Sequence, residues 1–281
     1  MAQHPPEDVY MGRRHLEDVY MGPLPLIAPS PDQRFRWEPS SRRIRAVFGG
    51  VTIAQSDHVM LLLEAGRLPV YYFPWADVRA EALEPTAHST TSDLKGPATY
   101  WTVRAGDRVA EDAAWSYETP PPGSPGVAGY VAFYWDQMDA WFDEDERAVA
   151  HARDPYKLVD VRQSSRPVRV ELAGVTLAET RRPKLLFETP LPVRYYFSPE
   201  DVHMELLVPS ATTSQCAYKG AASHWSAKLG DQLFEDVAWC YQQPLHLAAQ
   251  VSGFVAFYQE RVDATVVDGE AVGRPRTPWA R

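Results

Sequence analysis

Short apolar runs separated by glycine, proline and polar residues fill most of this 281-residue chain. Runs such as 51–54, 59–64 and 70–73 end at turn-forming residues after four to six positions, which is typical of β-strands. Gly49-Gly50 and the segment 105–107 stand between such runs and predict hairpins. Strongly amphipathic helical stretches are lacking. The pattern therefore predicts a mainly β fold with little helix.

The same pattern occurs twice along the chain, 124 positions apart. The sequence Tyr-Tyr-Phe at 71–73 recurs at 195–197, and Val-Ala-Phe-Tyr at 131–134 recurs at 255–258. Aligned without a gap at this offset, the two copies are identical at roughly 36 of about 96 positions. Solenoid units are much shorter, at ~20–50 residues. The repeat therefore indicates a duplicated domain of ordinary small size.

The domain limits follow from this alignment. We predict a flexible N-terminal tail at residues 1–30 and a first domain at 31–146. A linker at 147–167 leads to a second domain at 168–272, and a C-terminal tail follows at 273–281. The first tail repeats the sequence EDVYMG at 7–12 and 17–22, either as a tolerated duplication or as a docking motif containing Tyr10 and Tyr20. The linker contains Asp154-Pro155-Tyr156, which favours a turn.

One segment differs between the two copies in its backbone preference. Residues 121–126 read Pro-Pro-Gly-Ser-Pro-Gly, whereas 245–250 read Leu-His-Leu-Ala-Ala-Gln. Proline and glycine disfavour a helix, so only the second segment is expected to form a helical turn.

Composition narrows the classes of protein and partner. Apolar residues make up 45% and charged residues 23% of the chain, as in folded soluble proteins. The net charge of −9 argues against a nucleic-acid partner, because an acidic surface repels phosphates. Apolar runs stay well below the ~18 residues of a spanning helix, and the N-terminal residues lack the pattern of a secretory signal. We expect a cytoplasmic protein without membrane contact.

The cysteines and histidines do not predict a metal site. Cys216 and Cys240 both lie in the second copy, which excludes a disulfide framework and a four-cysteine zinc site. The eight histidines form no pair at metal-ligand spacing. The sequence identifies no cofactor.

The most pointed chemical pattern is a strand with the sequence Glu-Asp-x-Ala-Trp-x-Tyr. Strict alternation would place a carboxylate, a tryptophan and a tyrosine on one face. That face would contain Glu111, Ala113, Trp115 and Tyr117 in the first copy and Glu235, Val237, Trp239 and Tyr241 in the second. Burial beside an indole would raise the pKa of the carboxyl group and suit it to acid–base catalysis. The alternative is that the aromatic residues are core and the glutamate caps the sheet end.

A second pattern is Lys-Gly, at Lys95-Gly96 and Lys219-Gly220. The glycine permits a positive φ, and the lysine could anchor a phosphate or carboxylate or could bridge to a glutamate that pins the loop. Cys216 precedes this motif in the second copy and would be a nucleophile if Lys219 or His224 lowered its pKa. Ser92 holds the equivalent place in the first copy, and Cys240 is expected to be buried and inert.

Several short motifs of this chain, taken together, resemble those of an uncharacterised bacterial and fungal family known as domain of unknown function 427. The resemblance extends over roughly residues 40–270. The motifs are Tyr218-Lys219-Gly220, His224-Trp225, Glu235-Asp236-x-Ala238-Trp239-x-Tyr241 and Gly253-x-Val255-Ala256-Phe257-Tyr258, with Lys95-Gly96, Trp101, Glu111 to Tyr117 and Gly129 to Tyr134 in the first copy and Arg153-Asp154-Pro155-Tyr156 between them. The resemblance implies a small β-tent fold similar to methionine sulfoxide reductase B and glutathione-dependent formaldehyde-activating enzymes. The four zinc cysteines of that wider group are absent from this sequence.

The resemblance also bears on activity. The family has been labelled a possible nucleotidyltransferase, which implies a divalent ion near Glu235 or Asp236. The family's Cys-Pro-Tyr-Lys-Gly resembles the segment 216–220 more closely than the first copy, so the second copy is the better candidate for an active one.

Our leading hypothesis is that each copy binds a small polar or anionic molecule in a pocket. In the second copy Glu235 would act as acid or base, Lys219 as anion anchor and Cys216 as nucleophile, within walls formed by Tyr218, His224, Trp225, Trp239 and Tyr241. The first-copy pocket would contain Lys95, Trp101, Glu111, Trp115 and Tyr117. The alternatives are a non-catalytic scaffold, with the copies packed as an intramolecular pseudo-dimer, and a nucleotidyltransferase.

Overall fold

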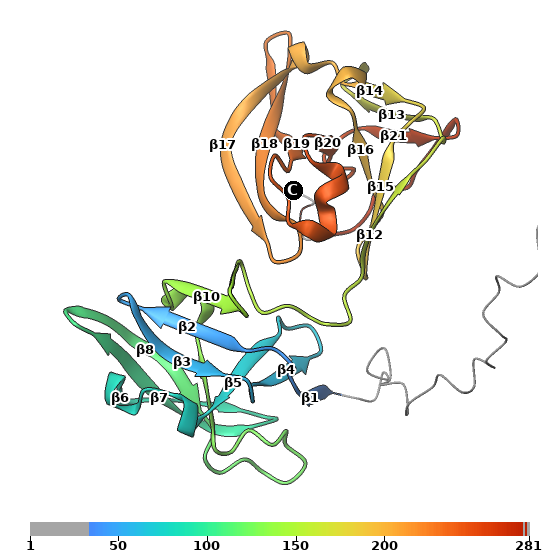
Figure 1. Cartoon of the computed structure of the whole chain (residues 1–281). Coiled ribbons are helices and arrows are strands. Elements are labelled where there is room, and N and C mark those ends of the chain that lie inside the picture. Colours follow the sequence, from blue (N-terminus) through green and yellow to red (C-terminus); the bar gives the residue numbers. More distant parts are fainter. Residues whose placement is uncertain (1–33, 278, 280–281) are drawn as a thin grey trace, which may run out of the picture.

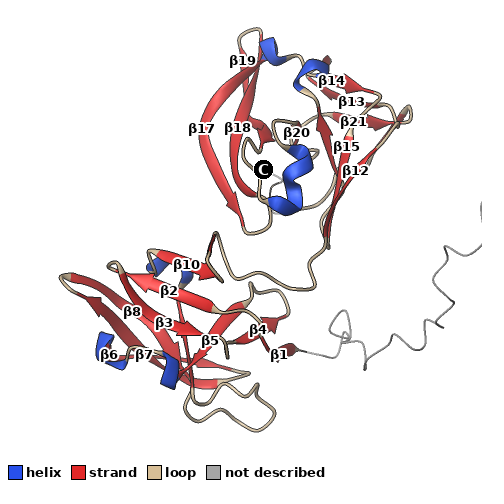
Figure 2. Cartoon of the chain, in the orientation of Figure 1, coloured by secondary structure: helices blue, strands red, loops and turns tan. Residues whose placement is uncertain are grey.

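The computed structural model of the chain describes residues 34–277 and 279. The duplicated EDVYMG segment, with Tyr10 and Tyr20, lies outside the described residues. The chain folds into two β units joined by a connecting segment, here called repeat one and repeat two (Figure 1). Over the described residues, the helices are short 3-10 turns (Figure 2). The predictions of a mainly β fold and of two tandem units are confirmed.

Each repeat consists of a seven-stranded and a four-stranded antiparallel sheet. The large sheet of repeat one has the order β1 (Phe35–Pro39), β4 (Met60–Glu64), β5 (Val70–Pro74), β9 (Tyr130–Phe133), β8 (Arg108–Ser116), β7 (Gly96–Ala105) and β6 (Leu83–Ser92). Its small sheet has the order β11 (Glu146–Ala148), β10 (Ala140–Asp143), β2 (Ile44–Phe48) and β3 (Val51–Ser56).

Repeat two has the same two sheets in the same topology. Its large sheet has the order β12 (Val159–Gln163), β15 (Lys184–Glu188), β16 (Arg194–Phe197), β20 (Val255–Phe257), β19 (Gln232–Cys240), β18 (Gly220–Leu229) and β17 (Leu207–Cys216). Its small sheet has the order β14 (Val175–Thr180), β13 (Val168–Leu172), β21 (Ala264–Val267) and β22 (Glu270–Ala271). Strand β12 lies inside the segment assigned to the linker, and η7 (His246–Val251) forms where the sequence predicts a helical turn.

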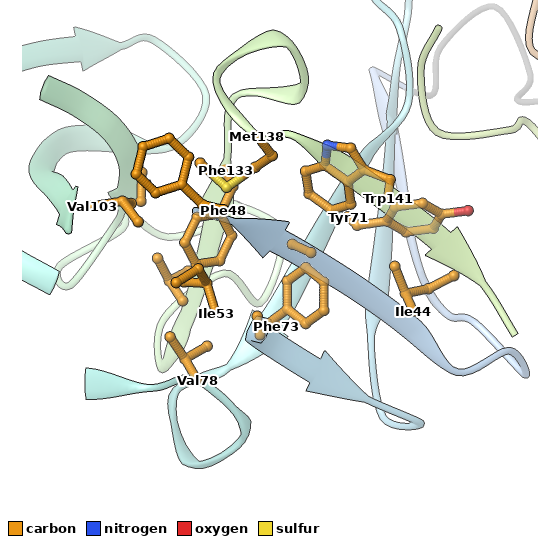
Figure 3. Packing of buried hydrophobic residues seen from close by; sticks show 14 of the residues in the cluster. Ile44, Phe48, Ile53, Tyr71, Phe73, Val78, Val103, Phe133, Met138 and Trp141 are labelled. Carbon is orange, nitrogen blue, oxygen red and sulfur yellow. The ribbon is translucent and has the colours of Figure 1, made fainter. Parts of the chain in front are cut away.

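The large sheet of each repeat is apolar on both faces. In β5, Tyr71 and Phe73 point to one face and pack in the core between the two sheets, whereas Tyr72 lies in a second cluster on the other face. Figure 3 shows the first core, with residues of the small sheet such as Ile44 and Trp141 packed against Phe73. Repeat two divides in the same way, with Tyr196 in the second cluster. The second face is where the candidate site forms.

A β-bulge in β8 and β19 breaks the alternation that the sequence suggests. Asp112 and Asp236 have positive φ values of 50° and 49°, and the strand register shifts opposite them. Aspartate tolerates the left-handed backbone region better than most residues. Each bulge turns the preceding glutamate, Glu111 or Glu235, out to an exposed position. The two glutamates therefore do not share a face with Trp115 and Trp239, which corrects the expected arrangement.

The connecting segment contacts both repeats. Ala152 is 2% exposed and belongs to the core cluster of repeat one, while the Arg153 side chain donates to the carbonyl of Ala217 in repeat two at 2.8 Å. None of the helices among the described residues is long and apolar enough to cross a membrane.

The hairpin between β2 and β3 allows a stability prediction. A Cβ atom at Gly49 would lie 2.8 Å from the Cβ of Ala105, whereas a Cβ at Gly50 would meet nothing within 4 Å; both glycines have positive φ. Gly50→Ala should cost roughly 1–2 kcal/mol for the left-handed backbone alone. Gly49→Ala should cost about 1–3 kcal/mol more, because the hairpin must shift away from Ala105. Chemical denaturation of both variants checks this, and equal losses would contradict it.

Candidate functional site

A cavity of about 540 Å³ opens on the second face of the large sheet in repeat two. This face supplies side chains that alternate with the core residues of the same strands, and the largest of them are aromatic. The apolar wall contains Leu186, Tyr196, Trp239, Tyr241, Tyr258 and Trp279. The volume is within the range found for small-molecule pockets.

At one end of the cavity, two lysines form salt bridges with the same carboxylate. The Lys219 Nζ contacts Glu188 Oε2, and the Lys157 Nζ lies 3.1 Å from Glu188 Oε1. The Glu188 side chain is only 4% exposed. Gly220 follows Lys219 with a φ of 93°, so the glycine supplies the turn that directs the lysine to this position. At this end two ammonium groups therefore share one carboxylate.

A third cation, Arg194, lies in the aromatic part of the cavity. Its guanidinium forms two hydrogen bonds with Glu260, of 2.8 and 2.6 Å, and the Thr277 hydroxyl donates to the same carboxylate. Burial raises the pKa of Glu260, but the bonds from Arg194 and Thr277 outweigh it and leave the pKa lowered. The Arg194 Cζ lies 5.6 Å from the Trp239 ring centroid and 5.5 Å from that of Trp279. Arg194 is therefore charge-balanced and supports two aromatic walls.

His224 and Tyr258 form a hydrogen-bonded pair inside the cavity. The His224 Nδ1 lies 3.2 Å from the carbonyl oxygen of Thr212, which can only accept, so Nδ1 carries a proton. In the neutral ring, Nε2 then accepts from the Tyr258 hydroxyl, also at 3.2 Å. Burial raises the pKa of Tyr258, opposed by Arg261 and Arg194. Tyr258 is therefore a protonated donor at neutral pH.

Asp236 lines the cavity, where the sequence predicts its neighbour Glu235. Its Oδ2 accepts from the Thr212 hydroxyl at 2.9 Å, whereas its buried Oδ1 has no hydrogen-bond partner among the described residues. Burial raises the pKa of Asp236, but the hydroxyls of Ser210 and Thr212 and the charges of His224 and Arg261 together lower it. Asp236 is therefore held as a carboxylate.

Six of the predicted second-copy residues line the same cavity: Cys216, Tyr218, Lys219, His224, Trp239 and Tyr241. Two others do not. Glu235 is exposed and lies outside the cavity wall, and Trp225 packs against the core between the sheets. Burial raises the pKa of Tyr218 to about 12 and also raises that of Tyr241, so both phenols remain neutral. Cys240 is buried, as expected.

Repeat one retains the framework of this site. The Lys95 Nζ lies 2.5 Å from Glu64, which confirms the alternative of a lysine–glutamate bridge, and the Trp115 indole donates to Tyr72 as Trp239 does to Tyr196. Tyr117 is buried beside them, whereas Trp101 packs against the core and Glu111 is exposed.

Three polar residues of the cavity are replaced in repeat one. Positions 124 residues earlier carry Val70 for Arg194, Tyr100 for His224 and Gln137 for Arg261. Trp37 of β1 also packs on this face, with its ring centroid 5.2 Å from that of Tyr72. The same framework is therefore closed by apolar and aromatic side chains in repeat one and lined by cations in repeat two.

Sequence reasoning missed several residues of the cavity. Arg194, Arg261, Glu188, Lys157 and Trp279 all line it. For the two arginines, a signal was present in the alignment of the copies, because each replaces an uncharged residue of repeat one. Lys157 and Trp279 lie outside the aligned region, so the alignment could not reveal them.

A metal site needs several ligating side chains close together. Within residues 34–277 and 279, no three His, Cys, Asp or Glu side chains lie together in a way that could hold a metal ion.

Comparison with known proteins gives one family. The family model described as Domain of unknown function (DUF427) matches the chain twice, over residues 36–144 and 160–268, once in each repeat. No curated protein matches the chain.

The lowered pKa of Asp236 predicts a pH-dependent contribution to stability. A carboxyl group whose pKa is lower in the folded state stabilises the fold above its ordinary value of about 4, and this contribution is lost as the pH falls through the lower folded value. Asp236→Asn keeps the side-chain volume and the tolerance of positive φ. It should cost about 1–2 kcal/mol at pH 7 through the weakened hydrogen bonds, and less at pH 3. Urea unfolding at both pH values measures this.

The exposed Asp231→Asn, in the turn between β18 and β19, is the matched control and should leave stability nearly unchanged. A loss in Asp236→Asn that is the same at pH 7 and pH 3 would show that the carboxylate charge is not responsible.

Proposed function

Since the chain belongs to the DUF427 family, whose description assigns no reaction, its function has to be inferred from the cavity. We propose that repeat two binds a small anion with a flat, partly apolar body. The observation that carries this is the charge of the lining. Lys157, Lys219, Arg194 and Arg261 line the cavity together with two carboxylates, Glu188 and Asp236, and Glu260 pairs with Arg194. One cation is left in excess, in a chain with a net charge of −9. A cationic, largely buried cavity in an acidic protein favours an anionic ligand.

The lysine end is the proposed anchor for the anionic group. Both oxygens of Glu188 are occupied, one by each lysine, so a single carboxylate serves two ammonium groups. Uncompensated charge is costly in a buried position. A carboxylate or phosphate on the ligand would remove this cost and accept the remaining N–H donors of Lys157 and Lys219.

We propose that the planar part of the ligand binds against the aromatic wall. The ring centroids of Trp239 and Tyr258 lie 4.4 Å apart, and the Arg261 Cζ lies 4.4 Å from the Tyr258 ring. Aromatic and guanidinium faces favour planar groups, through stacking and cation–π contact. A mononucleotide belongs to this ligand class, in line with the nucleotidyltransferase label of the family, and so do aromatic carboxylates.

Acid–base catalysis on the bound anion is a second candidate function, favoured by the pair of His224 and Tyr258. The imidazole and the protonated phenol share one hydrogen bond within the cavity. Such a pair can accept a proton from a ligand and donate one to it. Glu235, which is exposed outside the cavity, has no part in this version of the reaction.

Binding of simple anions tests the proposal. Phenyl phosphate should bind more tightly than inorganic phosphate, because it fills the aromatic wall as well as the lysine end, and benzylamine should not bind. Arg261→Gln introduces the side chain that repeat one has at this position, Gln137, and should weaken phenyl phosphate binding about tenfold. Titration calorimetry at low salt measures these affinities, with adenosine monophosphate as a further ligand.

Lys228→Gln is the control, since it removes one cation from an exposed position outside the cavity. It should leave the affinity unchanged. Tighter binding of benzylamine than of phenyl phosphate, or equal losses in Arg261→Gln and Lys228→Gln, would refute an anion site in repeat two.

A further inference from the structure

The cavity of repeat two is not formed by repeat two alone. His151 and Lys157 line it, yet both precede the matched family domain, which begins at residue 160. Trp279 lines it from beyond residue 268, where that domain ends. The anchor lysine Lys157 therefore comes from the segment that connects the repeats, and its position depends on what holds that segment.

The connecting segment is fixed by a turn. The Tyr156 N–H donates to Asp154 Oδ1 at 2.8 Å, and the Lys157 N–H donates to the Asp154 carbonyl at 3.2 Å. Pro155 lies between them, so the segment 154–157 has the Asp-Pro arrangement typical of a tight turn. Tyr156 and Lys157 are consecutive residues of this turn, and their side chains contact different repeats.

Tyr156 is held by repeat one. Arg36 Nη2 donates to its hydroxyl at 2.6 Å, and the hydroxyl donates to Glu38 Oε2 at 2.9 Å. The Arg36 Cζ lies 3.9 Å from the centroid of the tyrosine ring. Both partners belong to β1, and the Arg36 side chain is only 10% exposed. Hydrogen bonds with charged partners are the stronger kind, so this is a firm attachment.

Lys157 is held by repeat two. Its Nζ contacts Glu188, as described above, and lies 5.1 Å from the centroid of the Tyr218 ring. The Tyr218 hydroxyl in turn accepts from the Asp154 N–H at 2.7 Å. Consecutive residues thus connect β1 of repeat one to the lysine end of the cavity.

We propose that repeat one is a positioning domain for the site in repeat two, and that Tyr156 is the positioning residue. By fixing Tyr156 through Arg36 and Glu38, repeat one places Lys157 beside Lys219. The consequence for the ligand rests on the proposed anion binding, whereas the placement of Lys157 does not.

The placement is tested first, without any ligand. Tyr156→Phe in the full chain removes the hydroxyl that joins Arg36 and Glu38 and keeps the aromatic ring. Pulse acetylation followed by mass spectrometry reports how often the Lys157 amine leaves Glu188. The acetylation rate of Lys157 should rise about tenfold, a factor that corresponds to the loss of one charge-assisted hydrogen bond. The rate at the exposed Lys228 should not change.

Tyr130→Phe, at a half-buried tyrosine of repeat one outside this contact, is the matched control and should leave the Lys157 rate unchanged. The melting temperature of each variant separates a local release from partial unfolding. An unchanged Lys157 rate in Tyr156→Phe, or the same rise in Tyr130→Phe, would overturn the proposal.

The effect on the site is tested with phenyl phosphate as the probe. Tyr156→Phe and Lys157→Met should each weaken binding severalfold, and the double variant should bind no more weakly than Lys157→Met, because the tyrosine acts only through the lysine. Additive losses would overturn the proposal. If the wild-type chain does not bind phenyl phosphate, the anion site is refuted, and the acetylation rates still decide whether repeat one places Lys157.

Discussion

Each large sheet has two apolar faces, and the rest of the structure depends on how the second face is covered. The first face is covered in the same way in both repeats, by the small four-stranded sheet. The second face exposes tyrosine and tryptophan side chains that have to be shielded from water. In repeat one Trp37 of β1 and Tyr100 of β7 shield them. In repeat two these positions carry Val161 and His224, and a cavity remains.

The comparison of the two repeats separates structural residues from candidate functional ones. The buried lysine–glutamate pair, the tryptophan that donates to a tyrosine hydroxyl and the left-handed aspartate are present in both. A feature that is equally present in the closed repeat and in the open one serves the fold first. Arg194, His224 and Arg261 occur only in repeat two, where the equivalent positions of repeat one are Val70, Tyr100 and Gln137, so these three side chains distinguish the open cavity from the packed face.

Much of the fold and part of the site could be predicted from the sequence. The period of 124 residues gave the two repeats, and glycine-bearing turns gave the hairpins, because both signals are local in the chain. Lys219, Trp239 and Tyr241 were found for the same reason, since they recur at fixed spacing. Glu235 was misplaced because alternation holds only in a regular strand, and the positive φ of Asp236 interrupts it. Propensity alone does not reveal a bulge.

Lys157 could not be predicted as a site residue, because its role depends on contacts between units and not on a pattern within one. The segment after repeat one reaches repeat two, whereas the equivalent segment after repeat two, with Trp279, folds back on its own unit. One copy of the family domain therefore lacks part of the wall found here. A duplicated chain can keep one repeat closed without loss, provided that this repeat still holds the connecting segment. Arg36 and Glu38 hold Tyr156 of that segment, and under our proposal this is the task that the closed repeat retains.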